Sequence, residues 1–349
     1  MKKRIALVCT MLLLLTMSTL FAAGNAKTAP KQLIISTWGL SEDALWSEVY
    51  EPFEKQYNVK VILDTGNAQE RYMKLKNDPN STVDVIELSQ KNTADGVADG
   101  LFAPLKAGDL IDYAKLIPGA KALIDSGSGA PYTLNSIGII YNPKKAGMTI
   151  TRWEDLWNPA LKGKISIPDI TTTFGPAFLV MCSDVKGVNF ATDKGETAFK
   201  ALEALKPNVL RTYAKSSDVA SLFANGEIAV AIVGDFGVPV ISKADPDTVF
   251  VVPASGTYAN FNVINIAKNT KNRDLAVAYV NYRLNAETQL RTAKALNEAP
   301  VNSAVILTPE LAANKTVGDV ARRAKMVDFS VINPLMGAWV DRFNRLMNK

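Results

Sequence analysis

Leu33-Ile-Ile-Ser-Thr37 is a short apolar and β-branched run, and two runs of the same kind follow it, Val59-Lys-Val-Ile-Leu63 and Val83-Asp-Val-Ile-Glu-Leu88. Between the first two runs, apolar residues recur at a spacing of four at positions 45, 49 and 53, which is typical of a helix. Helical patterns also follow the second and third runs, at 68–75 and 93–100. Because strands that alternate with helices form sheets covered by helices, this stretch predicts an α/β fold.

The same alternation continues over roughly residues 140–255 and predicts a second α/β lobe. Strands are expected at 137–141, 164–168, 228–233 and 249–252, and helices near 197–205 and 218–225. Thr151-Arg-Trp-Glu154 has the pattern of a capping box that starts a short helix, with Trp153 and Trp157 as core anchors. A strand at 261–266, a helix at 274–284 and a helical pattern over 317–347 complete the chain. Its 349 residues fit two domains.

The chain contains no histidine, and this excludes several classes of site. Ser-His-Asp and Cys-His catalysis, His-ligated zinc or copper and facial-triad iron all require that residue. We therefore expect no catalytic residues, no metal site and no cofactor.

The first 26 residues have the pattern of a secretory signal peptide. Lys2, Lys3 and Arg4 precede an apolar run that is too short to span a bilayer, and Gly24-Asn-Ala26 has the small residues of a cleavage site. Cys9 lies inside the apolar run without a lipoprotein box, so no lipid attachment is expected. We expect a mature chain that begins near Lys27 and is free in the periplasm; an uncleaved anchor is the alternative.

The mature chain would be nearly neutral. Without the three basic residues of the leader it has 36 basic and 34 acidic side chains, a net charge of +2, and no long basic run. Neither nucleic acid nor an anionic membrane is therefore expected as a partner. The remaining cysteine, Cys182, lies in an apolar segment and is interpreted as a core residue.

Three groups of segments follow one another along nearly the whole mature chain. They are Ser36-Thr-Trp-Gly39 through Gly100-Leu-Phe-Ala-Pro-Leu105, Asn135-Ser-Ile-Gly-Ile-Ile-Tyr-Asn142 through Leu161-Lys-Gly-Lys-Ile-Ser-Ile-Pro-Asp169, and Asn225-Gly-Glu-Ile-Ala-Val-Ala-Ile-Val233 through Asn297-Glu-Ala-Pro-Val-Asn302. In this order they resemble the extracellular solute-binding proteins of ABC transporters, in the branch that includes the spermidine and putrescine receptors.

The resemblance implies a two-lobed periplasmic binding protein fold of type II, with a ligand cleft between lobes joined by hinge strands. Lobe 1 would comprise residues 27–139 plus 259–300, and lobe 2 residues 140–258 plus 301–349. The hinges would lie near 139–142 and 258–262. The partners implied are a small-molecule ligand and an inner-membrane ABC permease, and we expect a monomer.

Ligand sites in open α/β sheets gather at the carboxyl ends of strands, so the residues just past each strand are the candidates. These candidate ligand-binding residues are Trp38, Asn67, Ser89, Gln90, Asp169, Thr173, Asp235, Phe236, Asn260 and Asn262. Trp38 is expected to stack on the ligand, with core packing as the alternative. Asp235 is expected at the cleft mouth, paired with a ligand ammonium, although a solvated or capping aspartate would have the same pattern. Asp169 can equally cap a helix, and Arg71 is a counter-charge candidate or a solvated helix residue.

Departures from the polyamine pattern change the expected ligand. By ungapped alignment, Thr173 and Asn262 stand where polyamine receptors carry acidic residues, and Gly234 and Asn260 where they carry tryptophans. A cleft with fewer carboxylates favours a ligand with fewer positive charges. We expect a small monocation or zwitterion, similar to an amino acid, γ-aminobutyrate or an aminophosphonate, with a polyamine receptor as the alternative.

Two further classes remain as remote alternatives. Ser183-Asp-Val-Lys186 matches the Ser-x-x-Lys pattern of exported serine and lysine enzymes, without a second motif of that class. A ferric-ion receptor of similar fold would need adjacent tyrosines or a His-Tyr set, and the sequence has neither.

Overall fold

A computed structural model describes residues 31–39 and 41–348 of the chain. The predicted signal peptide, with Cys9 and the expected start at Lys27, lies outside the described residues. Within the described part, no helix combines the length and the apolar character needed to cross a membrane.

One curled, mixed sheet runs through the molecule, in the order β2-β1-β3-β9-β4-β7-β5-β6, with β8 paired to β4 and β10 paired to β9. The strands are β1 (Lys31–Thr37), β2 (Val59–Thr65), β3 (Val85–Ser89), β4 (Ala130–Tyr141), β5 (Ile165–Pro168), β6 (Val209–Tyr213), β7 (Val230–Gly234), β8 (Val249–Val251), β9 (Thr257–Ile266) and β10 (Ala324–Met326). β3, β4 and β7 are buried along their whole length, as expected for apolar runs covered on both faces.

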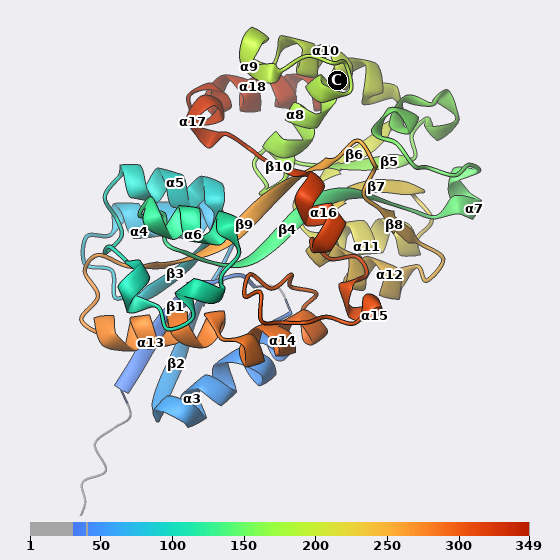
Figure 1. Ribbon diagram of the computed structural model, residues 1–349. Helices are drawn as coiled ribbons and strands as arrows, with labels where there is room; N and C mark the ends of the chain where they lie inside the picture. The colour runs from blue at the N-terminus through green and yellow to red at the C-terminus, as the bar shows by residue number, and fades with distance from the viewer. Residues whose placement is uncertain (1–30, 40, 349) are drawn as a thin grey trace, which may run out of the picture.

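Helices cover both faces of this sheet (Figure 1). The α-helices are α2 (Glu42–Leu45), α3 (Glu51–Tyr57), α4 (Ala68–Asn77), α5 (Gln90–Ala98), α6 (Pro118–Asp125), α7 (Pro143–Ala146), α8 (Gly175–Asp184), α9 (Phe190–Asp193), α10 (Glu196–Leu205), α11 (Ser216–Ala224), α12 (Val238–Ala244), α13 (Arg273–Leu284), α14 (Ala286–Ala295), α15 (Pro309–Ala312), α16 (Gly318–Arg323), α17 (Phe329–Ile332) and α18 (Met336–Met347). Short 3₁₀ or π turns are η1 (Trp46–Tyr50), η2 (Ala107–Asp109), η3 (Tyr113–Lys115), η4 (Trp153–Trp157), η5 (Pro159–Leu161), η6 (Lys206–Asn208), η7 (Asp235–Gly237) and η8 (Asn333–Leu335).

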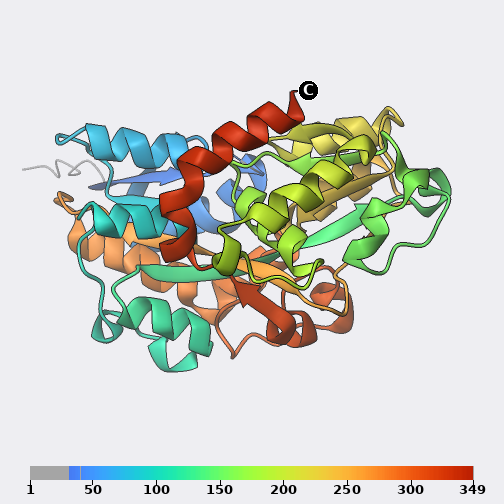
Figure 2. The ribbon, with the colours of Figure 1, turned by 90° about the horizontal axis from the view of Figure 1, so that it is seen from above.

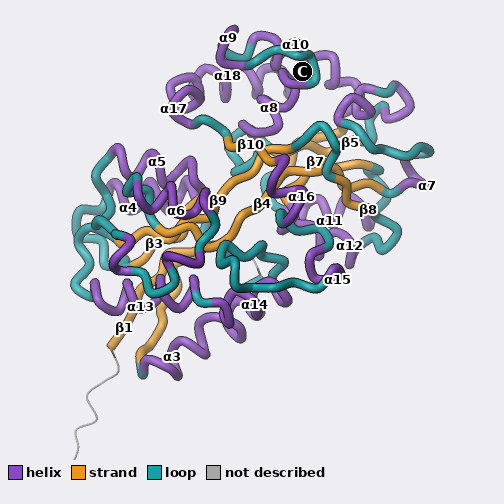
Figure 3. The backbone as a smooth tube through the Cα atoms, viewed as in Figure 1, coloured by secondary structure: helices purple, strands orange, loops and turns teal. Residues whose placement is uncertain are grey.

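Two long strands, β4 and β9, join the two halves of the molecule, and Figure 3 shows them running side by side between two groups of helices. β4 pairs with β9 up to Ser136 and with β7 from Ile137 onward. The change of partner thus lies a few residues before the predicted crossing at 139–142. β9 pairs with β10 at its start and with β3 at its end. Its Tyr258 packs in the same hydrophobic cluster as Ile137, and its Phe261 in the same cluster as Leu33, so β9 also contacts both halves.

Each half has its own hydrophobic core, and we call the halves lobe 1 and lobe 2. The lobe 1 core extends from Leu33 to Val301 and includes helix α13, while the main lobe 2 core extends from Ile137 to Phe343. In the second core, Trp339 of α18 packs edge-on against Phe190 and Phe199. The C-terminal helix therefore packs against α9 and α10, and the view from above shows it, in red, beside the yellow-green helices (Figure 2).

The α/β fold expected from the sequence is confirmed, and two local predictions are wrong. The predicted helix over 317–347 is broken, because residues 324–326 instead form β10 against β9 and Pro334 lies in the 3₁₀ turn before α18. At Thr151, Asp155 and not Glu154 supplies the cap, since its carboxylate accepts the N–H groups of Thr151 and Arg152 at 2.9 Å each. Cys182 is fully buried, as predicted, and burial raises the pKa of its thiol.

Candidate functional site

A small cavity of about 110 Å³ lies between the two lobes, beside β4 and β9. Its lining combines aromatic, amide and hydroxyl side chains with one carboxylate. The lining residues are Trp38, Ser41, Tyr132, Thr133, Asn135, Thr173, Phe236, Asn262, Leu296 and Glu298. Of the residues named from the sequence, the structure brings together Trp38, Thr173, Phe236 and Asn262 here.

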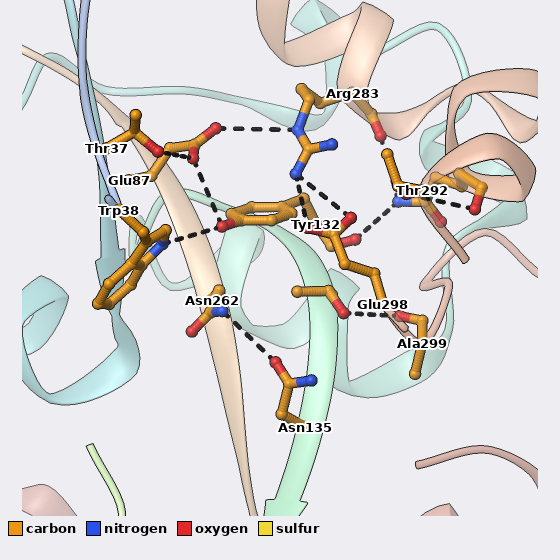
Figure 4. Close-up of polar contacts among 12 residues, drawn as sticks. Thr37, Trp38, Glu87, Tyr132, Asn135, Asn262, Arg283, Thr292, Glu298 and Ala299 are labelled. Carbon is orange, nitrogen blue, oxygen red and sulfur yellow. Dashed lines mark hydrogen bonds and ion pairs between the residues drawn. The ribbon is translucent and has the colours of Figure 1, made fainter. Parts of the chain in front are cut away.

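The Trp38 ring, directly after β1, is fixed at two places. Its Nε1 donates a hydrogen bond of 3.1 Å to the Tyr132 hydroxyl (Figure 4). The Arg71 guanidinium lies 4.8 Å from the ring centroid. Arg71 is 2% exposed and donates to the carbonyl oxygens of Ser36, Gly66 and Glu87. Burial lowers the pKa of Arg71 to about 10, so it stays charged at neutral pH. Arg71 is thus a buried support of Trp38, neither solvated nor part of the cavity lining.

Behind Trp38 and Tyr132 lies a buried carboxylate, Glu87. It accepts hydrogen bonds from Thr37 Oγ1 at 2.6 Å, from Tyr279 Oη at 2.8 Å and from Tyr132 Oη at 3.5 Å. Burial and the Glu87 charge together raise the pKa of Tyr132 well above its ordinary value, so its hydroxyl keeps its proton. The neutral hydroxyl can therefore accept from Trp38 and donate toward Glu87 at the same time.

Glu298 supplies the carboxylate of the cavity lining, and it was not among the residues predicted from the sequence. Its Oε1 lies 3.1 Å from Nη2 of Arg283, and the two side chains are 15% and 1% exposed. Figure 4 shows Arg283 between Glu298 and Glu87, and its guanidinium lies 4.3 Å from the centroid of the Tyr132 ring. Burial alone would lower the pKa of Arg283, but Glu298, Tyr279 and Glu87 raise it well above its usual value. Glu298 thus faces the cavity as one half of an ion pair.

Phe236 supplies the aromatic wall on the side of lobe 2. Its ring stacks on Phe174, with centroids 6.0 Å apart and planes 16° from parallel. A Cβ atom on Gly234 would lie 2.5 Å from carbon atoms of both rings. The glycine that stands where polyamine receptors were expected to carry a tryptophan therefore leaves room for this pair of phenylalanines.

Asp235 does not lie at the cleft mouth, where its position after a strand predicts it. Its side chain is 1% exposed instead of emerging at the cleft mouth, and it does not line the cavity. It accepts hydrogen bonds from Asn135 Nδ2 at 2.8 Å, from the Ser136 N–H at 3.3 Å and from the Thr316 hydroxyl. Burial raises the pKa of Asp235 to about 6, although these hydrogen bonds act in the opposite direction.

The other predicted residues lie outside the cavity lining. Asn67, Ser89, Gln90 and Asp169 are at or just past strand ends, as expected, whereas Asn260 lies inside β9. Asn67 and Ser89 are the N-caps of α4 and α5, and Asp169 accepts the Thr171 N–H at 2.9 Å in a turn. Asn260 is buried and accepts the backbone N–H of Gln90 at 3.1 Å. Their side chains therefore bond within the chain, and their roles in ligand binding stay predictions.

Ser183 and Lys186 do not form a catalytic pair. Ser183 is fully buried, and its hydroxyl donates to the Val188 carbonyl at 2.9 Å. The Lys186 ammonium instead lies 5.4 Å from the centroid of the Trp157 ring. The described geometry does not suit a serine nucleophile with a lysine base.

Comparisons with known proteins agree with this architecture. The family described as bacterial extracellular solute-binding protein matches residues 48–318. The spermidine/putrescine-binding periplasmic protein of Escherichia coli (strain K12) is 24% identical over 286 residues, which are 78% of this chain and 81% of that protein. A gamma-aminobutyric acid-binding protein of Pseudomonas aeruginosa is 23% identical over 293 residues, 82% of this chain and 81% of that protein.

A crystal structure of an ABC transporter protein from Clostridium perfringens ATCC 13124 is 51% identical to this chain. It covers 90% of this chain and 100% of its own, with a TM-score of 0.79. These relatives are solute-binding proteins rather than enzymes, and the two-lobed fold predicted from the sequence is confirmed. The chain therefore belongs to the bacterial extracellular solute-binding protein family, as the substrate-binding component of an ABC importer.

Proposed function

We propose that this receptor captures a small nitrogen-containing solute with a single ammonium group, either a monocation or a zwitterion, in the cavity between the lobes. Amino acids, γ-aminobutyrate and aminophosphonates are the compounds of this kind that we favour. The observation that carries this proposal is the charge of the cavity wall. Among the described residues that line it, Glu298 is the one carboxylate, and it is paired with the buried Arg283.

A second ammonium group would find no partner of opposite charge in this lining. Thr173 and Asn262, which line the cavity, are neutral. The Asp235 carboxylate lies outside the lining and already accepts hydrogen bonds from Asn135, Ser136 and Thr316. An ammonium group that loses water without gaining a charged partner costs several kcal/mol. The further ammonium groups of spermidine would each meet this cost, so polyamines should bind more weakly than a singly charged amine.

The aromatic and amide groups suit the remainder of such a solute. Trp38 and Phe236 present ring surfaces that can contact an alkyl chain or an ammonium group. Asn135 and Asn262 can donate to a ligand carboxylate or phosphonate. The gamma-aminobutyric acid-binding relative supports a zwitterion, whereas the spermidine/putrescine-binding relatives support the alternative of a polyamine.

We also propose that the mature chain begins near Lys27, lacks a lipid, is monomeric in the periplasm and delivers its ligand to an inner-membrane permease. The leader pattern of residues 1–26 supports export, and the family supports the permease. Mass spectrometry of the exported protein tests the first point. An acylated N-terminus, or a chain that still contains residues 1–26, would contradict it.

A thermal-shift screen of the mature chain against amines, amino acids, aminophosphonates and polyamines tests the ligand class. A ligand at about 100 times its Kd stabilises a protein by about 2.7 kcal/mol, which is readily seen as a rise in Tm. Calorimetry then gives the Kd of the best compound for the wild type and for Glu298→Gln. Because the variant keeps an oxygen for Arg283 but loses the charge, we expect binding to weaken by about 1.5 to 3 kcal/mol.

The matched control is Glu310→Gln, the same change at an exposed glutamate of α15. It should leave the Kd unchanged. Melting curves of both variants separate lost affinity from lost stability. Spermidine or putrescine bound more tightly than every singly charged amine, or equal affinities in Glu298→Gln and the wild type, would overturn the proposed ligand class.

A further inference from the structure

A chain of side-chain amides crosses the molecule from α5 in lobe 1 to Asp235 in lobe 2. The Gln90 N–H donates to Asn260 Oδ1 at 3.1 Å, and Asn260 Nδ2 donates to Asn262 Oδ1 at 3.1 Å. Asn262 Nδ2 donates to Asn135 Oδ1 at 3.4 Å, the contact drawn in Figure 4, and Asn135 Nδ2 donates to Asp235 Oδ1 at 2.8 Å. We call the three asparagines and Asp235 the amide relay.

Each end of the amide relay is bonded to a group that cannot exchange its role as hydrogen-bond donor or acceptor. A backbone N–H such as that of Gln90 only donates, so the Asn260 oxygen must face it. An ionised carboxylate only accepts, so the Asn135 nitrogen must face Asp235. Because the two ends impose the same direction, the orientation of Asn262 between them is also determined.

The direction of the relay matters because Asn135 and Asn262 line the cavity. Within the relay each of these two amides uses one N–H and one oxygen lone pair. The second N–H and the second lone pair of each amide are then directed by the same fixed orientation. The Gln90 N–H and the Asp235 carboxylate, which do not line the cavity, therefore determine which amide atoms a ligand meets on this wall.

We propose, on the basis that this cavity is the ligand site, that Asp235 is a positioning residue whose ionised carboxylate sets the orientation of the Asn135 and Asn262 amides that face the ligand. Asp235 does not itself line the cavity. Protonation weakens this hold whichever oxygen takes the proton. On Oδ1 the proton would oppose Asn135 Nδ2, whereas on Oδ2 it would face the Thr316 hydroxyl, which also donates to Ser136 Oγ at 2.8 Å, and Oδ1 would become a neutral, weaker acceptor. In both cases Asn135, and Asn262 bonded to it, lose the charged group that sets their direction.

The charged groups described near Asp235 do not replace its carboxylate as the acceptor for Asn135. Lys315, in the segment that also contributes Thr316, favours the ionised form, and its Nζ donates to Asn297 Oδ1 at 2.7 Å. Asn297 in turn donates to the Asp235 carbonyl at 2.9 Å. On the segment after Asn297, Glu298 is paired with Arg283. From β4, the contacts to the carboxylate come from the uncharged Asn135 and Ser136.

The test is the pH titration of the side-chain amide NMR signals of the ligand-free mature chain, labelled with nitrogen-15 at asparagine. The signals of Asn135 and Asn262 should shift together with one midpoint near pH 6, the pKa to which burial raises Asp235. In Asp235→Asn both shifts should vanish between pH 5 and 7.5. A purely structural aspartate would change Tm when replaced but would not give these two amides a shared midpoint.

Asp245→Asn is the matched control, because Asp245 is also buried and accepts from an asparagine, Asn142, at 2.9 and 3.1 Å. It should leave the titration of Asn135 and Asn262 unchanged. If Asp235→Asn does not fold, the wild-type titration still shows whether Asn135 and Asn262 share one midpoint. An Asn262 signal that stays flat while Asn135 titrates, or equal titrations in wild type and Asp235→Asn, would overturn the positioning role. Since no ligand is present, this result is independent of whether the proposed ligand class is correct.

Discussion

At the scale of single residues, the Trp38 ring is the most directly testable part of the cavity wall. Its edge is held by Tyr132 and its face by Arg71. We predict that Trp38→Ala weakens binding of the best compound from the thermal-shift screen by about 1.5 to 3 kcal/mol, because the stacking surface is lost. Calorimetry measures the Kd. Trp157→Ala, which removes a tryptophan bonded to the Ala201 carbonyl away from the cavity, should lower Tm without changing the Kd.

Asp235 also predicts how stability depends on pH. Its pKa is about 6 in the folded chain against 3.8 for an ordinary aspartate, so the folded state holds this proton more tightly than the unfolded state. The contribution of this group to stability is complete below about pH 4 and is lost as the pH rises through about 6. Two pKa units correspond to about 3 kcal/mol.

Urea unfolding of the wild type and Asp235→Asn at pH 4 and pH 7 measures this effect. The free energy of unfolding of the variant, relative to the wild type, should rise by up to about 3 kcal/mol between the two pH values. Taking the difference removes the opposite contributions of carboxylates such as Asp245, whose pKa is lowered. A difference that is the same at both pH values would contradict the raised pKa.

The sequence located part of the cavity because residues past a strand end tend to meet at one edge of a sheet. Trp38 and Phe236 follow strands and line the cavity, but their place in the sequence does not show whether the neighbouring Asp235 side chain points into it. The buried Asp235 carboxylate accepts a hydrogen bond from Thr316, 81 residues further along the chain, and no local pattern reveals such a contact. Glu298 follows a helix rather than a strand, so the strand-end pattern does not indicate it, although it lies in Asn297-Glu-Ala-Pro-Val-Asn302, which carries part of the resemblance.

At the scale of elements, β4 is the strand on which the joining of the lobes depends. A Cβ atom on Gly138 would lie 2.4 Å from the Phe250 ring and 2.9 Å from the Val251 carbonyl oxygen. We predict that Gly138→Ala lowers the free energy of unfolding by about 1 to 3 kcal/mol, because the ring and β8 must both shift.

Gly337→Ala is the control for this prediction. Apart from its chain neighbours and the backbone of its own helix, no atom of the described residues lies within 4 Å of the added Cβ near the start of α18. It should raise the free energy of unfolding by a few tenths to about 1 kcal/mol through helix propensity. Urea unfolding measures both variants. Equal effects of the two substitutions would show that β8 does not pack on β4 as described.

Strands were easier to predict than the C-terminal helices. β1, β2 and β5 follow apolar runs that local sequence defines. The structure extends β1 and β2 by two residues each and begins β5 one residue later than predicted. The segment 317–347 has a helical pattern, yet Ala324–Met326 pairs with Thr257–Ala259 of β9. A pairing between residues so far apart in the chain leaves no local signal, and tertiary contacts override helix propensity there.

At the scale of the whole molecule, two cores joined by β4 and β9 predict that the lobes move as units. We expect the ligand to close them on the cavity that contains Trp38 and Phe236 on opposite walls. Small-angle X-ray scattering should therefore give a smaller radius of gyration at saturating ligand. An unchanged radius, with saturation shown by calorimetry on the same sample, would count against closure.

A crystal structure of the mature chain with the best compound from the screen tests the central claim most directly. We expect the ligand in the cavity between the lobes, with its ammonium nitrogen within hydrogen-bond distance of Glu298 and its carbon chain against Trp38. A second, larger cavity of about 480 Å³ in lobe 2, lined by Trp153, Asp184, Tyr258 and Lys325 among others, offers a clear alternative position. Ligand bound there, or a ligand that leaves Glu298 bonded to Arg283 alone, would contradict the assignment of the site.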